Sequence, residues 1–121
     1  MNTEENNKLI AEFMGMQKTD IGWYDAEELM DLWYTTDNTF DELLFNKSLD
    51  WLMSVVKKIN SSTDEWGNTN DFMIGNGYVW VDPHIGDRIF FSGNTSEDME
   101  EPMISKVYRG VLAFINHPKS K

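Results

Sequence analysis

The sequence predicts a small α+β protein, a layered sandwich in which about three α-helices pack on a small, mainly antiparallel β-sheet of three to five strands. Three observations lead to this prediction. Three segments repeat apolar residues at the spacing of an amphipathic helix. A block between the second and third segments alternates apolar and polar residues around glycine turns, as antiparallel strands do. The length of 121 residues fits one domain, which we place over residues 1–121.

The first helix is predicted to begin at Asn2 or Thr3 and to end at Gly15, a residue that readily adopts the left-handed conformation of a helix end. On the polar face, Lys8 and Glu12 have the spacing of an ion pair. The apolar face consists of Leu9, Ile10, Phe13 and Met14.

Residues 17–46 have a less regular pattern. We expect a short strand at residues 21–24 and a helix at residues 26–34 with Asp25 as its cap. A second short strand is predicted at residues 43–45.

The second helix is predicted over residues 48–59. Ser48 can cap it, Asp50 lies in its first turn, and Lys57 and Lys58 lie in its last turn, so the charges match the helix dipole at both ends. We expect Trp51 and Val55 to flank a buried stripe made of Leu49, Leu52, Met53, Val56 and Ile59.

A β-hairpin is predicted from residues 72–74 and 78–81, joined by a glycine-rich turn, with a third strand at residues 88–91. Tyr78 and Trp80 should point to one face of the sheet, and Val79 and Val81 to the other. The last helix should begin at Pro102 and end before Pro118. Its apolar face consists of Ile104, Val107, Tyr108, Val111, Leu112 and Ile115.

Three segments carry a resemblance to a known family: residues 7–15 (NKLIAEFMG), residues 48–59 (SLDWLMSVVKKI), and Val107-Tyr108 followed by VLAFI at 111–115. They resemble the phage ABA sandwich domain family, small proteins of bacteriophages and of prophage regions in gut bacteria. The chain departs from the family pattern at Leu49 and Ser54, where tryptophan and proline are common. The resemblance implies an α/β/α-type sandwich and a phage or prophage origin. It implies no activity and no catalytic residues.

Composition excludes several classes of function. The net charge of −11 repels nucleic-acid phosphates and anionic lipids, so we expect no direct binding to nucleic acid or membrane. The absence of cysteine excludes disulfides and thiolate metal sites. With a polar N-terminus and no long apolar run, we expect a cytoplasmic protein of the bacterial host cell, a monomer or a weak dimer.

Eight acids and no Lys or Arg occur at residues 19–46, together with aromatic residues that are common in binding surfaces. This composition predicts a non-enzymatic module that binds a basic host or phage protein, and one variant of this prediction is a nucleic-acid mimic. The alternative is an acidic surface that serves only solubility. The predicted interaction surface consists of Asp20, Trp23, Tyr24, Asp25, Glu27, Glu28, Asp31, Trp33, Tyr34, Asp37, Asp41 and Glu42.

No catalytic, cofactor-binding or metal-binding residue is assigned. Asp82, His84 and Asp87 offer carboxylate and imidazole groups, but the neighbouring Pro83 and Gly86 favour an ordinary turn. Two other functions remain open. One is a small enzyme or ligand-binding domain with a pocket near Trp80 and His84, and the other is self-assembly through the edge of the strand at residues 88–91.

Overall fold

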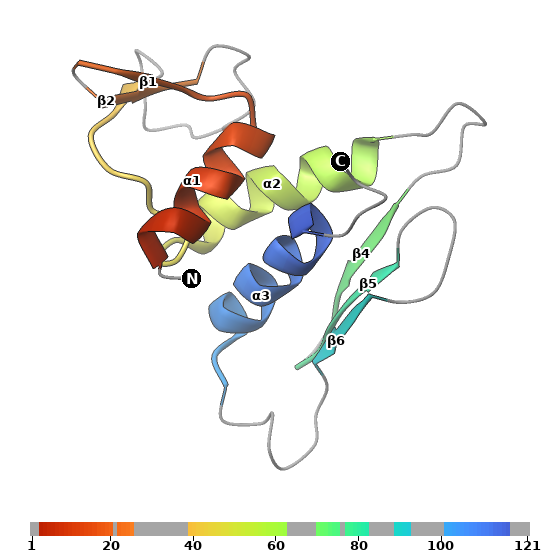
Figure 1. The fold of residues 1–121 in the computed structure, drawn as a ribbon. Coiled ribbons are helices and arrows are strands. Elements are labelled where there is room, and N and C mark those ends of the chain that lie inside the picture. Colours follow the sequence, from red (N-terminus) through yellow and green to blue (C-terminus); the bar gives the residue numbers. More distant parts are fainter. Residues whose placement is uncertain are drawn as a thin grey trace.

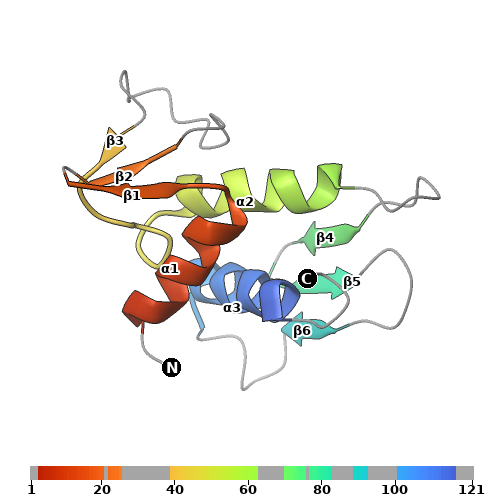
Figure 2. The ribbon, with the colours of Figure 1, turned by 45° about the horizontal axis from the view of Figure 1, so that its top comes forward.

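The computed structural model describes residues 3–20, 22–25, 39–62, 70–75, 77–82, 89–92 and 101–116. Within these residues, three helices occupy the middle of the molecule and a three-stranded antiparallel sheet lies on either side of them (Figures 1 and 2). The elements are α1 (Thr3–Phe13), β1 (Gln17–Thr19), β2 (Gly22–Tyr24), β3 (Thr39–Phe40), α2 (Leu49–Ser61), β4 (Asp71–Ile74), β5 (Val79–Asp82), β6 (Phe90–Ser92) and α3 (Met103–Asn116).

The predicted α+β class with antiparallel strands is confirmed, but the strands form two sheets and not one. The N-terminal sheet has the order β1-β2-β3, and the C-terminal sheet has the order β4-β5-β6. The reason lies in α2, which separates β3 from β4 along the chain and packs toward both sheets. At its N-terminal end, Trp51 meets the Phe40 ring edge to face at 4.7 Å. At its C-terminal end, Asn60 is hydrogen-bonded to the backbone of β4.

The first helix agrees with the prediction. Ile10 and Met14 are fully buried, and the backbone amide of Met14 donates to the Ile10 carbonyl at 3.0 Å. Gly15 has a φ of 75°, the left-handed conformation that ends a helix without steric cost to glycine. The ring of Phe13 packs edge to face on Phe114 of α3, with 5.9 Å between ring centres.

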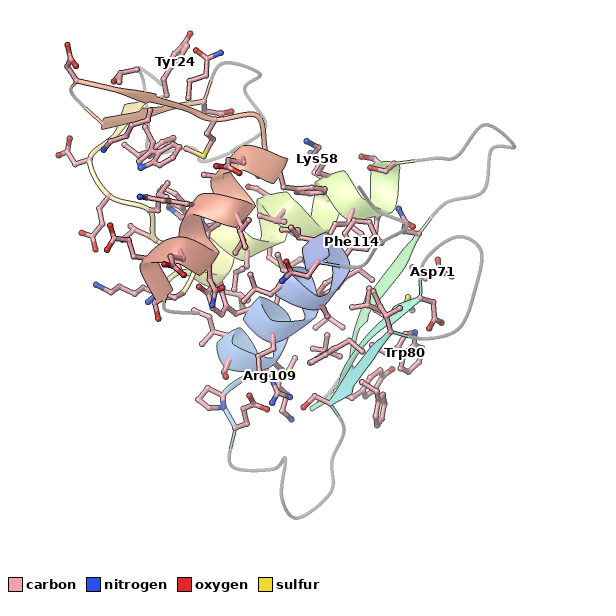
Figure 3. The ribbon with its side chains drawn as sticks, in the orientation of Figure 1. Tyr24, Lys58, Asp71, Trp80, Arg109 and Phe114 are labelled. Carbon is pink, nitrogen blue, oxygen red and sulfur yellow. The ribbon has the colours of Figure 1, made fainter. Side chains whose placement is uncertain are left out.

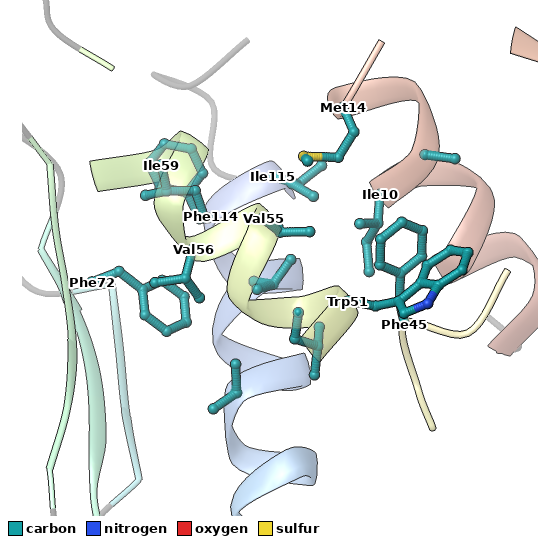
Figure 4. Packing of buried hydrophobic residues seen from close by; sticks show 14 of the residues in the cluster. Ile10, Met14, Phe45, Trp51, Val55, Val56, Ile59, Phe72, Phe114 and Ile115 are labelled. Carbon is teal, nitrogen blue, oxygen red and sulfur yellow. The ribbon is translucent and has the colours of Figure 1, made fainter. Parts of the chain in front are cut away.

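The second helix begins where predicted, because the Ser48 hydroxyl accepts a hydrogen bond from the Trp51 amide. The predicted stripe is right for Leu52, Val56 and Ile59, which are buried. It is wrong for Leu49 and Met53, which are each 43% exposed. The Trp51 side chain, predicted to flank the stripe, packs between Phe40 and Phe45. The buried face of α2 is therefore centred closer to Trp51 and Val55 than predicted. Figure 4 shows the core that results. The residues of α2 that are buried are Trp51, Leu52, Ser54, Val55, Val56 and Ile59.

The strand predicted at residues 43–45 is wrong. This segment forms a turn in which the amides of Lys47 and Ser48 both donate to the Leu44 carbonyl, at 3.0 and 2.9 Å. The turn places Phe45 in the core and sets up the cap of α2. The strand lies earlier, at Thr39–Phe40, where it pairs with β2. The helix predicted at residues 26–34 falls outside the described residues.

The C-terminal hairpin agrees with the prediction. Val79 and Val81 are fully buried toward the helices, and Tyr78 stacks on Trp80 with 4.9 Å between ring centres. The third strand is shifted from residues 88–91 to Phe90–Ser92. The last helix begins directly after Pro102, as expected, and buries Phe114 in addition to the predicted residues Val107, Val111 and Ile115.

Side chains tie the helices to their neighbours. Asn60 accepts from the Phe72 amide at 2.8 Å and donates to the Phe72 carbonyl at 3.3 Å, so it replaces a strand partner at the free edge of β4. The ammonium of Lys58 donates to the Phe13 carbonyl at the C-terminal end of α1, where a positive charge complements the helix dipole. The buried Lys106 donates to the Gly77 carbonyl at 2.8 Å and holds the hairpin turn against α3.

Candidate functional site

The predicted interaction surface is partly within the described residues. Asp20, Asp41 and Glu42 are exposed, as expected. Tyr24 is 38% exposed and points away from the helices (Figure 3). Trp23 is its neighbour on β2 and takes the opposite face, where it packs against the core.

Asp25 is fully buried and therefore does not belong to the exposed surface, which corrects the prediction. It follows Tyr24 directly, and alternation along an extended chain turns it to the inner side with Trp23. Six further predicted residues lie outside the described part of the chain. They are Glu27, Glu28, Asp31, Trp33, Tyr34 and Asp37.

The exposed carboxylates of Asp20 and Asp41 belong to the same end of the N-terminal sheet. Thr19 pairs with Gly22 across the β1-β2 hairpin, and the Thr19 hydroxyl donates to the Gly22 carbonyl at 2.8 Å. Gly22 has a φ of 139°, and a Cβ atom at this position would lie 3.3 Å from the Cα of Asp41. The hairpin turn that starts at Asp20 is therefore in close contact with the residue that follows β3.

A cavity of about 580 Å³ opens beneath this sheet. Its walls come from three parts of the chain: the first turns of α1, the inner face of β1 and β2, and the segment that precedes α2. The lining residues are Thr3, Glu4, Asn7, Lys8, Lys18, Trp23, Glu42, Leu43, Asn46 and Lys47. This is not the pocket predicted near Trp80 and His84: Trp80 lies on the C-terminal sheet, and His84 is outside the described residues.

The floor of the cavity is built around Asn7, which is only 6% exposed. Its amide nitrogen donates to the Leu43 carbonyl at 3.2 Å and to Asn46 Oδ1 at 2.9 Å, and its Oδ1 accepts from the Tyr108 hydroxyl at 2.9 Å. A carbonyl can only accept, so the Leu43 contact fixes which end of the Asn7 amide is which. One side chain thus joins α1, the segment before α2, and α3.

Burial raises the pKa of the Tyr108 hydroxyl above its ordinary value of 10.0, which keeps it protonated as a donor to Asn7. Sequence reasoning missed the role of Asn7. A signal was present: Asn7 precedes Ile10 by three positions and Met14 by seven, so it lies on the buried face of α1. A polar residue there needs buried partners.

Basic residues gather at the cavity although the chain is acidic. Three of its ten Lys and Arg residues line this cavity, against two glutamates, in a chain of net charge −11. The ammonium of Lys47 lies 3.3 Å from a carboxylate oxygen of Glu42, and both side chains are exposed. The ammonium of Lys18 lies 5.6 Å from the centre of the Trp23 ring. Lys8 makes no ion pair with any described residue, and the expected pair with Glu12 does not form.

A row of apolar side chains lies on the outer face of the C-terminal sheet. The strand register places Met73 opposite Trp80, and Trp80 opposite Phe91. Phe91 is 53% exposed and Met73 is 43% exposed. Figure 3 shows Trp80 on the side of β5 away from α3. The prediction that Tyr78 and Trp80 share a face is confirmed by their stacking.

Metal-binding clusters and membrane-spanning helices were also considered among residues 3–20, 22–25, 39–62, 70–75, 77–82, 89–92 and 101–116. These residues contain no group of three or more His, Asp or Glu side chains placed to hold a metal ion. None of the helices formed by the described residues has the length and apolar character to span a membrane. Asp82 is half-buried, whereas His84 and Asp87 lie outside the described part of the chain.

Comparison with known proteins gave no relative. No family model matches the chain, and neither the curated proteins nor the solved structures contain a significant match.

Proposed function

We propose that this chain is a non-enzymatic interaction module of phage or prophage origin that binds a basic protein surface. The observation that supports this most is the outer end of the N-terminal sheet. There the exposed carboxylates of Asp20 and Asp41 belong to one end of the sheet, and Tyr24 faces outward on the central strand.

The two kinds of side chain have separate roles in this proposal. Carboxylates attract a basic partner and orient its approach, which raises the association rate. An exposed tyrosine supplies a large contact area and a hydroxyl, and it loses little conformational entropy when a partner covers it. A nucleic-acid mimic is one form of the same proposal, in which the carboxylates take the places of phosphates in a basic groove.

The test is capture of proteins from bacterial lysate by the immobilised chain at about 0.1 M and about 1 M salt, where the Debye length falls from roughly 10 Å to roughly 3 Å. We expect a captured basic protein at the lower salt and its loss at the higher salt. The variant Asp20→Asn/Asp41→Asn should lose the same protein at the lower salt.

The matched control is Glu12→Gln/Asp71→Asn, which removes two exposed negative charges from α1 and β4. Capture should survive in this variant, because its changes leave the N-terminal sheet intact. Capture that resists high salt, or equal loss in both double variants, would contradict a specific acidic surface.

Self-association is a second candidate function, favoured by the exposed row of Met73, Trp80 and Phe91 on the C-terminal sheet. The strand β6 is also an edge strand of that sheet. Under this hypothesis, light scattering should show a dimer that grows with concentration, and Phe91→Ser should weaken it. A constant monomer mass over the whole concentration range would eliminate this candidate.

A further inference from the structure

We propose that the cavity beneath the N-terminal sheet is a binding site for a small organic anion that carries a flat ring. The proposal is independent of the acidic outer surface, because the cavity lies on the other face of the sheet. It assigns a ligand of stated chemistry to Lys8, Lys18 and Trp23.

The cavity has the size of a ligand site. Its volume of about 580 Å³ lies within the range of roughly 300–1,000 Å³ that is usual for small-molecule pockets. Trp23 and Leu43 provide apolar wall, and the remaining lining is polar or charged. A few polar groups set into apolar wall are the usual composition of such a pocket.

Two of the lysines point to an anion. Lys47 is already neutralised by Glu42. Lys8 makes no ion pair with the described residues, and the ammonium of Lys18 lies over the Trp23 ring. Glu4 also lines the cavity, but it makes no ion pair with Lys8 or Lys18. A bound carboxylate or phosphate would accept hydrogen bonds from both.

Asn46 supplies a neutral donor. Its Oδ1 accepts from Asn7, whose own orientation is fixed by the Leu43 carbonyl. The amide NH₂ of Asn46 is therefore directed away from Asn7, and it belongs to a residue that lines the cavity. A neutral donor beside two ammonium groups adds geometric selection for an oxygen anion.

Trp23 provides the contact for the flat ring of the proposed ligand. It is half-buried on the inner face of β2, and Lys18 occupies the facing position on β1. The negative ligand group would meet Lys18 while the flat part of the ligand packs against the indole, an aromatic contact that adds to the gain from simple burial. The Asn7 network holds the floor in place before the ligand arrives, which lowers the ordering cost of binding.

The experiment is a titration of the whole chain followed by ¹⁵N-edited NMR, with the indole N–H of Trp23 as the reporter. The probes are two flat-ring anions, AMP and 1-naphthoate, with adenosine and 1-naphthalenemethanol as their uncharged counterparts. AMP and naphthoate distinguish a phosphate ligand from a carboxylate ligand. We expect at least one anion to shift the Trp23 signal, and its uncharged counterpart to bind at least roughly tenfold more weakly, as loss of a charge-assisted hydrogen bond requires.

Substitution separates this site from general charge effects. Lys8→Gln and Lys18→Gln should each weaken the anion by roughly tenfold, the effect of one charge-assisted bond. Lys57→Gln, on the exposed face of α2 and outside the lining, should leave the affinity unchanged. Because Lys8 and Lys18 are exposed, these variants should fold normally, which thermal melting checks.

The proposal fails if neither anion shifts the Trp23 signal at millimolar concentration, or if Lys57→Gln weakens binding as much as Lys8→Gln does. It also fails if the uncharged counterparts bind as tightly as the anions. The variant Asp20→Asn/Asp41→Asn should bind the anion with unchanged affinity, so the failure of either proposal leaves the other standing.

Discussion

Asn7 shows how much one polar side chain can organise in a small protein. It donates both amide hydrogens, to the Leu43 carbonyl and to Asn46, and its oxygen accepts from Tyr108. These partners lie 36, 39 and 101 residues away in sequence. A buried amide that is fully bonded contributes little net free energy, but a buried group left without its partner is costly. The Asn7 network therefore adds little to the free energy of unfolding, but it strongly disfavours other arrangements of the segments that it joins.

Replacing Asn7 by Asp tests this role. The change puts a carboxylate oxygen, which can only accept, against the Leu43 carbonyl and Asn46 Oδ1. We expect the free energy of unfolding in urea to fall by at least about 2 kcal/mol. Asn6→Asp is the matched control, since it makes the same chemical change one residue earlier on α1, and its stability should change by less than about 0.5 kcal/mol. Equal effects of the two substitutions would contradict the role assigned to Asn7.

Tyr108 predicts a dependence on alkaline pH. Its pKa is raised in the folded state by burial, whereas in the unfolded state it returns to its ordinary value of 10.0. Between these two pKa values only the unfolded state releases the proton, so the stability that Tyr108 contributes is complete below pH 10 and is lost as the pH rises further. Tyr108→Phe should therefore show a smaller loss of stability above pH 10 than the original chain.

Phenolate absorbance measures the same property directly. In the folded protein, burial raises the pKa of Tyr108, so Tyr108→Phe should remove phenolate absorbance that appears above pH 10. If Tyr108→Phe removed absorbance that appears at or below pH 10, Tyr108 would not be shielded as described.

At the scale of elements, the helices were predictable because their signals are local. Ser48 and Trp51 are three residues apart, and Gly15 ends α1 through its own conformation. The face that α2 buries was predicted less well, because Trp51 packs between Phe40 and Phe45, which precede the helix and do not enter its periodicity. The division of the strands into two sheets likewise depends on tertiary packing, which periodicity does not encode.

The candidate sites were likewise predicted only in part. Exposure of Asp20, Asp41 and Glu42 follows from their charge and was predicted, whereas burial of Asp25 was not. The cavity was missed because its walls come from three separate segments whose lysines appear unrelated in the sequence. A cluster of this kind becomes visible only when the fold has brought α1, β1 and the segment before α2 together.

The packing of α3 on the C-terminal sheet makes a further prediction. A Cβ atom at Gly110 would lie 3.0 Å from the Phe72 ring and 3.3 Å from both Phe90 and Val79. Gly110→Val should lower the free energy of unfolding by about 2 kcal/mol, because overpacking a buried contact costs about 1–3 kcal/mol and the gain in helix propensity is smaller. Ala113→Val, three residues later on α3 and half-buried, should cost less than about 1 kcal/mol in the same urea experiment. If Gly110→Val were as stable as Ala113→Val, α3 would not approach the sheet this closely.

At the scale of the whole molecule, the net charge of −11 acts against the fold. Like charges repel one another more strongly in the compact state than in the extended chain, and this repulsion is screened by salt. Two ion pairs of the described residues would respond in the opposite way, and both are weak. Lys47–Glu42 is exposed on both sides, and the Arg109 side chain that pairs with Glu101 is half exposed, so each pair is worth at most about 1 kcal/mol.

Salt should therefore stabilise this protein. Raising the ionic strength from about 0.01 M to about 0.15 M shortens the Debye length from roughly 30 Å to roughly 8 Å and screens most repulsion between distant carboxylates. We expect the free energy of unfolding to rise on the order of 1 kcal/mol, the energy of one close pair of charges in water. Sodium and potassium chloride should act equally, because screening depends on ionic strength alone. The variant Asp20→Asn/Asp41→Asn should gain less from salt than the original chain, since two repelling charges are already gone.

A fall in stability with added salt would show that ion pairs dominate repulsion. A basic partner that binds these carboxylates would neutralise the same charges that salt screens. At low ionic strength, binding of this partner should therefore raise the free energy of unfolding.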